Sequence, residues 1–392
     1  MTIKTLLFMN ERLLKPTGGP VGYLYNLKKV IDENEISSIE FITDYNKKNN
    51  FLKSIIMRII GNKNKQLIIN NILVNSIYKN KSAKKIDLSE YDIVHFHTTN
   101  SLFMNRENVK NFKGKVLLTT HSPKPAHLEI IENQLSKKER LYYRKKLKSI
   151  EKIDDYAFHR ADYIIFPCED AEEPYLNNWS KFKTIKKNNA NKFKYIPTGC
   201  SKCEAKKTKE EILKHWNIPA GSFVISYVGR HNETKGYDQL KLIGEKLLRE
   251  NDNIYFLIAG LEAPLTRLKH ERWIEVGWTN DPHSLINASD MFILPNKETY
   301  FDLIMLEVLS MGKIVLATNT GGNKYFKRFD KRGIFYYENL DEAINIILKI
   351  SNLTAEKKKE LEKCNLDIYN ANFTMKIFLQ NYLKILDEIC GV

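Results

Sequence analysis

The stretch ETYFDLIMLEVLSMG, from Glu298 to Gly312, decides the fold of this 392-residue chain. It follows the apolar run MFILP and precedes the apolar run KIVLAT, which begins at Lys313. Two apolar runs separated by an acidic loop and an amphipathic turn predict a strand, a helix and a second parallel strand. The N-terminus of that helix would direct amide hydrogens and a partial positive charge at the carboxyl edge of the sheet. We expect an anionic ligand such as a nucleotide diphosphate to bind there.

Apolar strands alternate with helical runs along the whole chain, which predicts an α/β fold with parallel sheets rather than a sandwich or a bundle. A chain of this length can bury two cores. The predicted strands of the first half are residues 4–9, 92–97, 115–120, 162–167 and 193–197, and those of the second half are 223–229, 254–260, 273–277, 291–295 and 313–318. Between the two sets, residues 196–211 are rich in Pro, Gly, Ser and Lys without apolar periodicity, as in a domain linker.

The cysteine content and the start of the chain bear on its location. Of five cysteines only Cys200 and Cys203 lie close together, which fits a reducing compartment better than a disulfide scaffold. The first residues run directly into the apolar stretch TLLFM, which we interpret as a first strand rather than a leader or a membrane span. We therefore expect a cytoplasmic protein.

The positive charge is concentrated in the first half of the chain. Residues 1–200 hold 35 Lys and Arg against 21 Asp and Glu, whereas residues 201–392 hold 27 against 26. This asymmetry suggests that the first half faces phosphorylated acceptors or an anionic membrane surface, the alternative being a solvated basic surface. Residues 51–79 and the helical stretch 136–152 mix basic with apolar residues, and each either lies on a membrane interface or packs on its own sheet. Nucleic acid is not expected as a partner, because zinc-knuckle, RRM and basic-zipper signatures are missing from the sequence.

Two cations follow the first strand of the second half. In YVGRHNETKGYDQL, Gly229 ends the strand, and Arg230 and Lys235 come before the next helix. Arg can grip a diphosphate with its planar fork and Lys acts as a point charge. Glycines also end the strands at 254–260 and 273–277, so that backbone can approach a ligand closely at this edge.

Taken in order, GRHNETKG, IAG, VGWTNDPHSLINASDMFILPN and ETYFDLIMLEVLSMGKIVLATNTGG resemble the donor-binding domain of retaining glycosyltransferases of family 4. The first half resembles the family more loosely through PTGGPVGYLYNL, YDIVHFHTT, LLTTHSPKP, ADYIIFP and KYIPTG. The terminal NFTMKIFLQNYLKILDEI resembles the last helix of such enzymes, which returns to the N-terminal domain. The resemblance implies a GT-B fold, with two Rossmann-like domains facing across a cleft. It assigns residues 1–198 to the acceptor side, 199–370 to the donor side and 371–392 to the returning helix.

The resemblance also implies roles for residues of the second half. Arg230 and Lys235 would hold the donor diphosphate, and Glu307 would receive the ribose hydroxyls. The backbone amides of Asp302 and Leu303 would face the phosphates.

The first acid of the family's paired-glutamate motif departs from the pattern. It normally precedes the second acid by eight positions and contacts the donor sugar, and here that position is Thr299. Glu298 lies one place earlier. Either the loop shifts Glu298 into the sugar site or Thr299 replaces the acid.

In the first half, Gly18 and Gly19 match the family's glycine loop at the phosphates, and His121 in THSP matches the histidine that reaches the transferred sugar. His95 and His97 alternate at one strand end, and we expect only one of them to point into the cleft. His97 is the candidate for ligand binding, with simple strand packing as the alternative. Asp154 and Asp155 are interpreted as part of a solvated helix face.

We expect neither a metal nor another cofactor. The sequence has no Asp-x-Asp triplet, and fixed cations with a helix N-terminus can stabilise the charge that develops on a leaving diphosphate. Cys200 and Cys203 could form half of a zinc site or a redox pair, but no second Cys or Cys/His pair in the sequence completes four zinc ligands. We therefore interpret them as two thiols in a linker.

These observations predict a retaining, metal-independent hexosyltransferase. It would move a sugar from a nucleotide diphosphate sugar, with UDP favoured, to a glycan acceptor, with a lipid-linked one favoured. The context would be polysaccharide, lipopolysaccharide or O-antigen biosynthesis, in the cytoplasm or peripherally at the inner face of the cell membrane. The alternatives are a non-catalytic nucleotide-sugar-binding partner, suggested by Thr299, a protein O-glycosyltransferase, and a sugar-nucleotide epimerase on the same fold.

Overall fold

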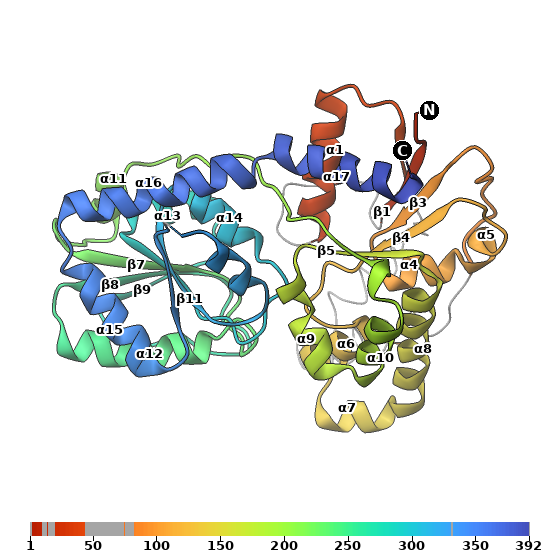
Figure 1. Ribbon diagram of the computed structural model, residues 1–392. Helices are drawn as coiled ribbons and strands as arrows, with labels where there is room; N and C mark the ends of the chain where they lie inside the picture. The colour runs from red at the N-terminus through yellow and green to blue at the C-terminus, as the bar shows by residue number, and fades with distance from the viewer. Residues whose placement is uncertain are drawn as a thin grey trace, which may run out of the picture. The chain divides into compact units, whose positions relative to one another are not determined.

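The computed structural model describes residues 2–9, 14, 20–43, 74, 82–330 and 332–391. In these residues two parallel sheets of six strands each alternate with helices (Figure 1). The predicted α/β class is therefore confirmed.

The first sheet has the strand order β2-β1-β3-β4-β5-β6. Its strands are β1 Thr5–Met9, β2 Ile39–Thr43, β3 Ile93–Phe96, β4 Lys115–Thr119, β5 Tyr163–Phe166 and β6 Phe193–Tyr195. The helices in this part of the chain are α1 Pro20–Glu33, α4 Thr99–Met104, α5 Arg106–Val109, α6 Ala126–Gln134, α7 Lys137–Tyr142, α8 Arg144–Arg160, α9 Glu173–Asn178 and α10 Ser180–Asn188, with 3-10 turns η1 Glu169–Glu172 and η2 Ala190–Lys192.

The second sheet has the order β12-β11-β10-β7-β8-β9. Its strands are β7 Phe223–Val228, β8 Ile254–Ala259, β9 Trp273–Gly277, β10 Met291–Leu294, β11 Ile314–Thr318 and β12 Ile334–Tyr337. The helices in this later part of the chain are α11 Lys209–His215, α12 Tyr237–Glu250, α13 Pro282–Ala288, α14 Leu303–Ser310, α15 Leu340–Ser351, α16 Ala355–Asn372 and α17 Met375–Cys390, with the 3-10 turn η3 Gly321–Arg328.

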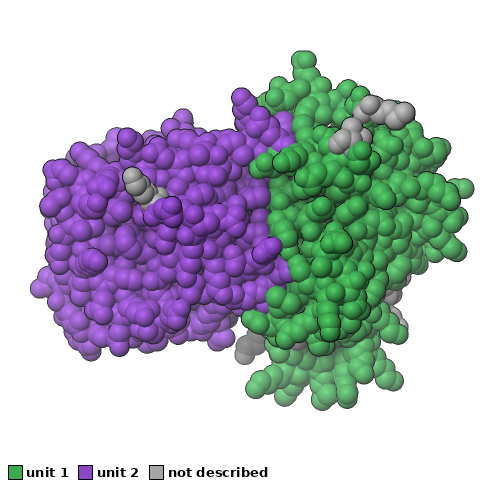
Figure 2. Space-filling view, in the orientation of Figure 1, with its two compact units in different colours: residues 1–166, 174–196, 381–392 green, residues 167–173, 197–380 purple. Residues whose placement is uncertain are grey.

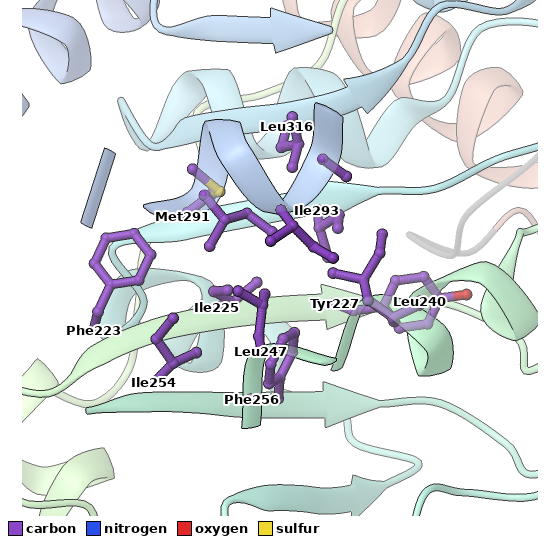
Figure 3. Packing of buried hydrophobic residues seen from close by; sticks show 14 of the residues in the cluster. Phe223, Ile225, Tyr227, Leu240, Leu247, Ile254, Phe256, Met291, Ile293 and Leu316 are labelled. Carbon is purple, nitrogen blue, oxygen red and sulfur yellow. The ribbon is translucent and has the colours of Figure 1, made fainter. Parts of the chain in front are cut away.

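Central strands of the second sheet are buried on both faces, which is why they appear in the sequence as unbroken apolar runs. Figure 3 shows Ile225 of β7 and Ile293 of β10 close to Leu240 and Leu247 of α12. These four side chains belong to one buried cluster that holds α12 against the sheet. The sheet is thereby fixed, and its carboxyl edge becomes a rigid support for the loops that follow the strands.

All ten strands expected from the sequence are present, and the described residues form two strands that the sequence did not predict. The missed strands, β2 and β12, each lie at the end of a sheet. Strand β2 has one buried residue among five, and the two middle residues of β12 are partly exposed. Because an edge strand is covered less completely than a central one, it carries a weaker apolar run.

The chain divides into two compact units, coloured separately in Figure 2. Unit 1 comprises residues 1–166, 174–196 and 381–392, and unit 2 comprises 167–173 and 197–380. The division after residue 196 falls within the stretch that the sequence marks as a linker. Helix α17 contributes its first residues to unit 2 and its last to unit 1.

The basic stretch 136–152 forms two helices rather than one. Helix α7 has a capping box, in which the Ser136 hydroxyl accepts from the Glu139 amide, and it buries none of its residues. Helix α8 packs through an apolar face that includes Leu147 and Ile150. The stretch 51–79 lies outside the described residues except for the buried Val74. Among the described helices, none is long and apolar enough to cross a membrane.

The interpretation of Asp154 as a solvated residue is wrong. Its side chain is fully buried in α8 and accepts hydrogen bonds from the Thr99 hydroxyl at 2.6 Å and from the His127 amide at 3.0 Å. A third contact joins it to His127 Nδ1 at 2.6 Å. The carboxylate satisfies polar groups of α4 and α6, so it is a structural link among three helices.

Candidate functional site

The loop after β7 positions Lys235 at the carboxyl edge of the second sheet. The Lys235 amide donates to the Asn232 side-chain oxygen at 2.8 Å, which closes a tight turn. Gly236 then adopts φ +66°, and a Cβ atom there would lie 1.7 Å from the carbonyl oxygen of Pro295. Only glycine allows this approach, which brings Lys235 beside the loop that follows β10.

Lys235 is paired with Asp302 in this structure. Its ammonium group donates to both Asp302 carboxylate oxygens at 2.8 Å. The side-chain amide of Asn296 donates to the same carboxylate. Asp302 is the N-cap residue of α14, but its side chain makes no capping hydrogen bond to that helix. The carboxylate therefore serves as the counterion of Lys235, a role that the sequence did not reveal, and Leu303 begins the helix as predicted.

Arg230 lies at the end of the same strand. Its side chain is exposed, and its carbonyl oxygen accepts from the Tyr227 hydroxyl at 2.9 Å. The backbone at Arg230 is thus fixed from the buried side while the guanidinium extends outward. The structure brings Lys235 and Asp302 into contact and places Arg230 on the same loop.

The loop from Glu298 to Asp302 packs closely on Gly321 and Gly322. The Gly322 amide donates to the Thr299 carbonyl at 3.3 Å, and a Cβ atom at Gly321 would lie 2.1 Å from that same oxygen. Thr299 is only 2% exposed, and its hydroxyl has no hydrogen-bond partner among the described residues. Glu298 is half-buried. Both alternatives for the first acid position remain predictions.

A carboxylate from a distant segment also reaches this edge. Glu173, in the piece 167–173 that belongs to unit 2, accepts from the Gly321 amide at 3.2 Å and from the Thr320 hydroxyl at 3.3 Å. It also pairs with Lys324. Nothing in the local sequence signals this contact, because it depends on where the chain returns to unit 2.

Glu307, on α14, contacts a histidine that sequence reasoning did not select. His283 Nε2 lies 3.0 Å from a Glu307 carboxylate oxygen. Hydrogen bonds to Cys203 and to Glu307 raise the pKa of His283 to about 10. His283 sits in the first turn of α13, whose N-cap Asp281 accepts from the Ser284 amide. The cap is visible in the sequence, but the meeting with Glu307 is not.

In unit 1 the ends of β3 and β4 bring three histidines together. His97 Nδ1 and His121 Nε2 are 2.8 Å apart, and the ring of Tyr23 lies 4.3 Å from that of His121. His95 contacts the Tyr382 hydroxyl and the Thr119 hydroxyl, each at 2.9 Å.

The interpretation of His95 and His97 as alternating across the strand is wrong, whereas the expectation that only one of them points into the cleft stays a prediction. Residues two apart on a strand share a face, and the two ring centroids are 4.2 Å apart. His97 is fully buried, and its Nε2 atom has no partner among the described residues. The predicted pair Gly18 and Gly19 lies outside the described residues.

Burial keeps this histidine cluster neutral. It lowers the pKa of His95 and of His121 to about 3 and holds that of His97 well below its usual value. One nitrogen of the His97 to His121 contact must therefore donate and the other accept. An unpaired buried N–H is costlier than an unpaired acceptor, which favours a proton on His97 Nδ1 and a bare Nε2. His121 would then carry its own proton on Nδ1 and act as a hydrogen-bond donor.

Part of the second half of the chain matches a family of known proteins. Residues 208–365 match the family model described as glycosyl transferases group 1. This range contains Lys235, Asp302 and Glu307. A UDP-Gal:alpha-D-GlcNAc-diphosphoundecaprenol alpha-1,3-galactosyltransferase of Escherichia coli is 27% identical over 157 residues, covering 37% of this chain and 40% of that protein. The match thus spans less than half of this relative.

Solved structures cover nearly the whole chain. Anabaena Alr3699/HepE in complex with UDP and glucose has a TM-score of 0.61 at 14% identity, covering 98% of this chain and 99% of that one. Sucrose-phosphate synthase from Thermosynechococcus elongatus has a TM-score of 0.64 at 16% identity, covering 99% of each chain. The fold is that of the GT-B glycosyltransferases.

Within a GT-B fold the two six-stranded parallel sheets are the two Rossmann-like halves. Lys235, Asp302 and Glu307 all follow or flank strand ends of the second sheet, inside the part that matches the family model. The histidine cluster belongs to the first sheet. The fold therefore places both groups of predicted site residues in the loops after strands or, for Glu307, in the helix that follows such a loop, while their individual roles remain predictions.

Proposed function

We propose that this protein is a retaining glycosyltransferase that transfers a sugar from a nucleotide diphosphate sugar, with UDP as the nucleotide, to a glycan acceptor on a lipid carrier. The observation that carries the proposal is the pairing of Lys235 with Asp302 at the start of α14, inside the glycosyl transferases group 1 match. A cation held at a helix N-terminus suits a diphosphate.

The proposed reaction needs stabilisation of a leaving group. The bond from the anomeric carbon to the phosphate oxygen breaks, and the acceptor hydroxyl attacks from the same face and gives its proton to that phosphate oxygen. Negative charge grows on the diphosphate, and Lys235, Arg230 and the first amides of α14 would offset it. Glu307 would accept from the ribose hydroxyls. The proposal includes no metal step.

Two further residues are assigned to the sugar. Glu298 supplies the only carboxylate at positions 298–301, and we assign it the role of the family's first acid. His121 would donate a hydrogen bond to a sugar hydroxyl, with His97 fixing its tautomer. A neutral imidazole suits this role because the reaction asks for orientation rather than for a strong base.

We further propose that the protein binds a membrane surface, where it meets its acceptor. Leu141 and Tyr142, at the end of α7, are 74% and 81% exposed. Exposed basic residues surround them in the sequence, namely Lys137, Lys138, Arg144, Lys145, Lys148 and Lys152. Apolar side chains among cations suit an anionic lipid interface. The E. coli relative is named for an acceptor on diphosphoundecaprenol, which supports a lipid-linked acceptor.

The membrane surface is tested by sedimentation with vesicles. The wild-type chain should sediment with vesicles that contain anionic lipid and much less with purely zwitterionic ones. The double variant Leu141→Ser, Tyr142→Ser should lose this binding, while Leu242→Ser, which changes a 46% exposed leucine on α12, should keep it. Equal binding by all three proteins would disprove this surface.

A non-catalytic nucleotide-sugar-binding protein is the second candidate, because Thr299 occupies the position of the family's first acid. Thermal-shift measurements with UDP, GDP, ADP, CMP and their sugar conjugates, without and with Mg²⁺, test nucleotide binding. A ligand at 100 times its dissociation constant should stabilise the protein by about 2.7 kcal/mol. Hydrolysis or transfer of the stabilising sugar nucleotide, lost in Glu298→Gln, would support the enzyme. Binding without turnover would support the second candidate.

A further inference from the structure

Unit 2 contains a cluster of three side chains of the types that can bind a metal ion. The proposed reaction does not use them as a metal site. They are Cys203, from the segment before α11, His283, in the first turn of α13, and Glu307, in α14. One ligand atom of each lies within 4.8 Å of the others, and all three side chains are partly accessible to solvent. The cluster is the one group of this kind in the part of the chain that the structure describes.

Two buried serines hold the backbone that places Cys203. The Ser310 hydroxyl accepts from the Cys203 amide at 3.1 Å and donates to the carbonyl of Glu307 at 2.7 Å. The Ser284 hydroxyl accepts from the amides of Lys206 and Lys207 at 3.0 and 2.9 Å. The segment is therefore tied to α14 by one serine and to α13 by the other.

These hydrogen bonds preorganise the backbone that carries the three side chains. The Ser284 hydroxyl also donates to Asp281, the N-cap of the helix that carries His283. The elements that supply the thiol, the imidazole and the carboxylate are thus joined by hydrogen bonds through backbone or caps. A metal site on elements fixed in this way needs only small side-chain movements to close on an ion.

We propose that Cys203, His283 and Glu307 bind a single Zn²⁺ ion. Sulfur, imidazole nitrogen and carboxylate oxygen are the three ligand types of zinc, whereas Mg²⁺ and Ca²⁺ take oxygen ligands. A thiolate and a carboxylate together balance the charge of the ion. Three protein ligands leave the fourth tetrahedral position to water.

The sequence pair Cys200 and Cys203 does not form this site. Cys200 is buried, its amide donates to the Phe373 carbonyl at 3.0 Å, and burial raises the pKa of its thiol. A thiol held in that way resists becoming the thiolate that zinc requires. The completing ligands come from His283 and Glu307, which are 80 and 104 positions further along the chain than Cys203.

The site has a consequence for the proposed reaction, and this step rests on the proposed function. Glu307 cannot offer the same carboxylate oxygens to a metal ion and to ribose hydroxyls. Zinc and the nucleotide should therefore weaken each other's binding by the same factor. In this arrangement zinc acts as an inhibitor rather than as a cofactor, in accord with a transfer step that uses no metal.

The experiment uses Co²⁺ as a spectroscopic substitute for Zn²⁺ on the full chain. Titration should produce a thiolate-to-cobalt charge-transfer band with one ion per chain, and Zn²⁺ should abolish it. Cys203→Ser should eliminate the band, and Cys364→Ser, which changes a partly exposed cysteine on α16, should leave it intact. His283→Gln should weaken cobalt binding by about tenfold or more. Absence of the band in the wild type, or its survival in Cys203→Ser, would overturn the site.

A second arm separates the metal site from the proposed function. Saturating UDP should shift the cobalt titration to higher concentrations in the wild-type chain. Cys203→Ser should retain turnover and lose its inhibition by Zn²⁺. If UDP fails to bind in the thermal-shift assay, the proposed function fails while the cobalt result stands by itself. If UDP binds but leaves the cobalt titration unchanged, the assignment of Glu307 to both ligands is wrong.

Discussion

At the scale of single residues, the charge of Lys235 is the central feature of the loop after β7. Its contact with both oxygens of Asp302 orients the ammonium group beside the N-terminus of α14. The two side chains are 29% and 17% exposed, so water screens the pair only in part. An incoming diphosphate would share the lysine with Asp302, and the lysine would shield the two anions from each other.

Replacing Lys235 by alanine should reduce kcat/KM for sugar transfer by on the order of 100-fold or more, since one preorganised donor to a developing oxyanion is commonly worth that much. The fold should persist, because the residue is only partly buried. Steady-state transfer or donor hydrolysis measures the effect. Lys246→Ala, which breaks an exposed pair with Asp341, is the matched control and should retain full activity. Full activity of Lys235→Ala would disprove the diphosphate assignment.

At the scale of elements, the approach of α12 to the loop after β10 depends on one glycine. Gly236 precedes α12 and lies against the Pro295 carbonyl, so that the lysine beside it meets the N-terminus of α14. Gly221 also has a positive φ, of +85°, but the space where its Cβ would lie is open. Substitution at Gly221 would therefore report the cost of backbone strain alone, whereas substitution at Gly236 would report strain together with a steric collision.

Gly221→Ala should destabilise the protein by about 1 to 2 kcal/mol, the cost of a left-handed conformation for a residue with a Cβ. Gly236→Ala should cost about 2 kcal/mol more, because strain and a backbone collision add there. Urea unfolding of both variants gives the difference. Nucleotide binding should weaken only in Gly236→Ala. Equal stability losses would mean that the Pro295 loop moves aside freely.

The central strands could be predicted from local sequence, whereas the edge strands β2 and β12 could not. A strand covered on both faces, such as β10 with four buried residues, must be continuously apolar, and that pattern is visible without knowledge of the fold. Strand β2, with one buried residue among five, carries no such pattern. The break between α7 and α8 at Tyr143 was also missed, because the basic run continues across it.

At the scale of the whole molecule, the two units should respond differently to acid. In unit 1, burial lowers the pKa of His95 to about 3, against an ordinary value of 6.5, and it lowers those of His97 and His121 as well. Between these values the unfolded chain binds protons that the folded unit does not, so stability is lost as pH falls.

In unit 2, two titrating groups contribute to the pH dependence of stability with opposite signs. The pKa of His231 is lowered to about 4 by burial, with the same sign as in unit 1. Burial raises the pKa of Glu275, 3.3 Å from His231, to about 7, so the folded unit holds a proton that the unfolded chain releases. That second contribution gains stability as pH falls from about 7 toward 4.5.

From pH 7 to pH 5, unit 1 should therefore lose more stability than unit 2. The lowered pKa of His95 by itself reduces the free energy of unfolding by about 2 kcal/mol at pH 5. Hydrogen exchange, corrected for the intrinsic pH dependence, should show weaker protection in β3 and β4 and smaller changes in β8 and β10. His95→Gln should reduce the pH dependence of unit 1. Equal loss of protection in both units would contradict this account.

The sequence by itself determined the parallel α/β class, the central strands and the place of α14, because burial periodicity and helix signals act over a few neighbouring residues. It also placed Arg230 and Lys235 after β7, and Asp302 and Glu307 after β10. Only the tertiary structure decided which side chains meet. The pairing of Lys235 with Asp302, the contact of His97 with His121 and the convergence of Cys203, His283 and Glu307 all join segments that are distant in the sequence. Such contacts depend on strand order and loop approach, which no local pattern encodes.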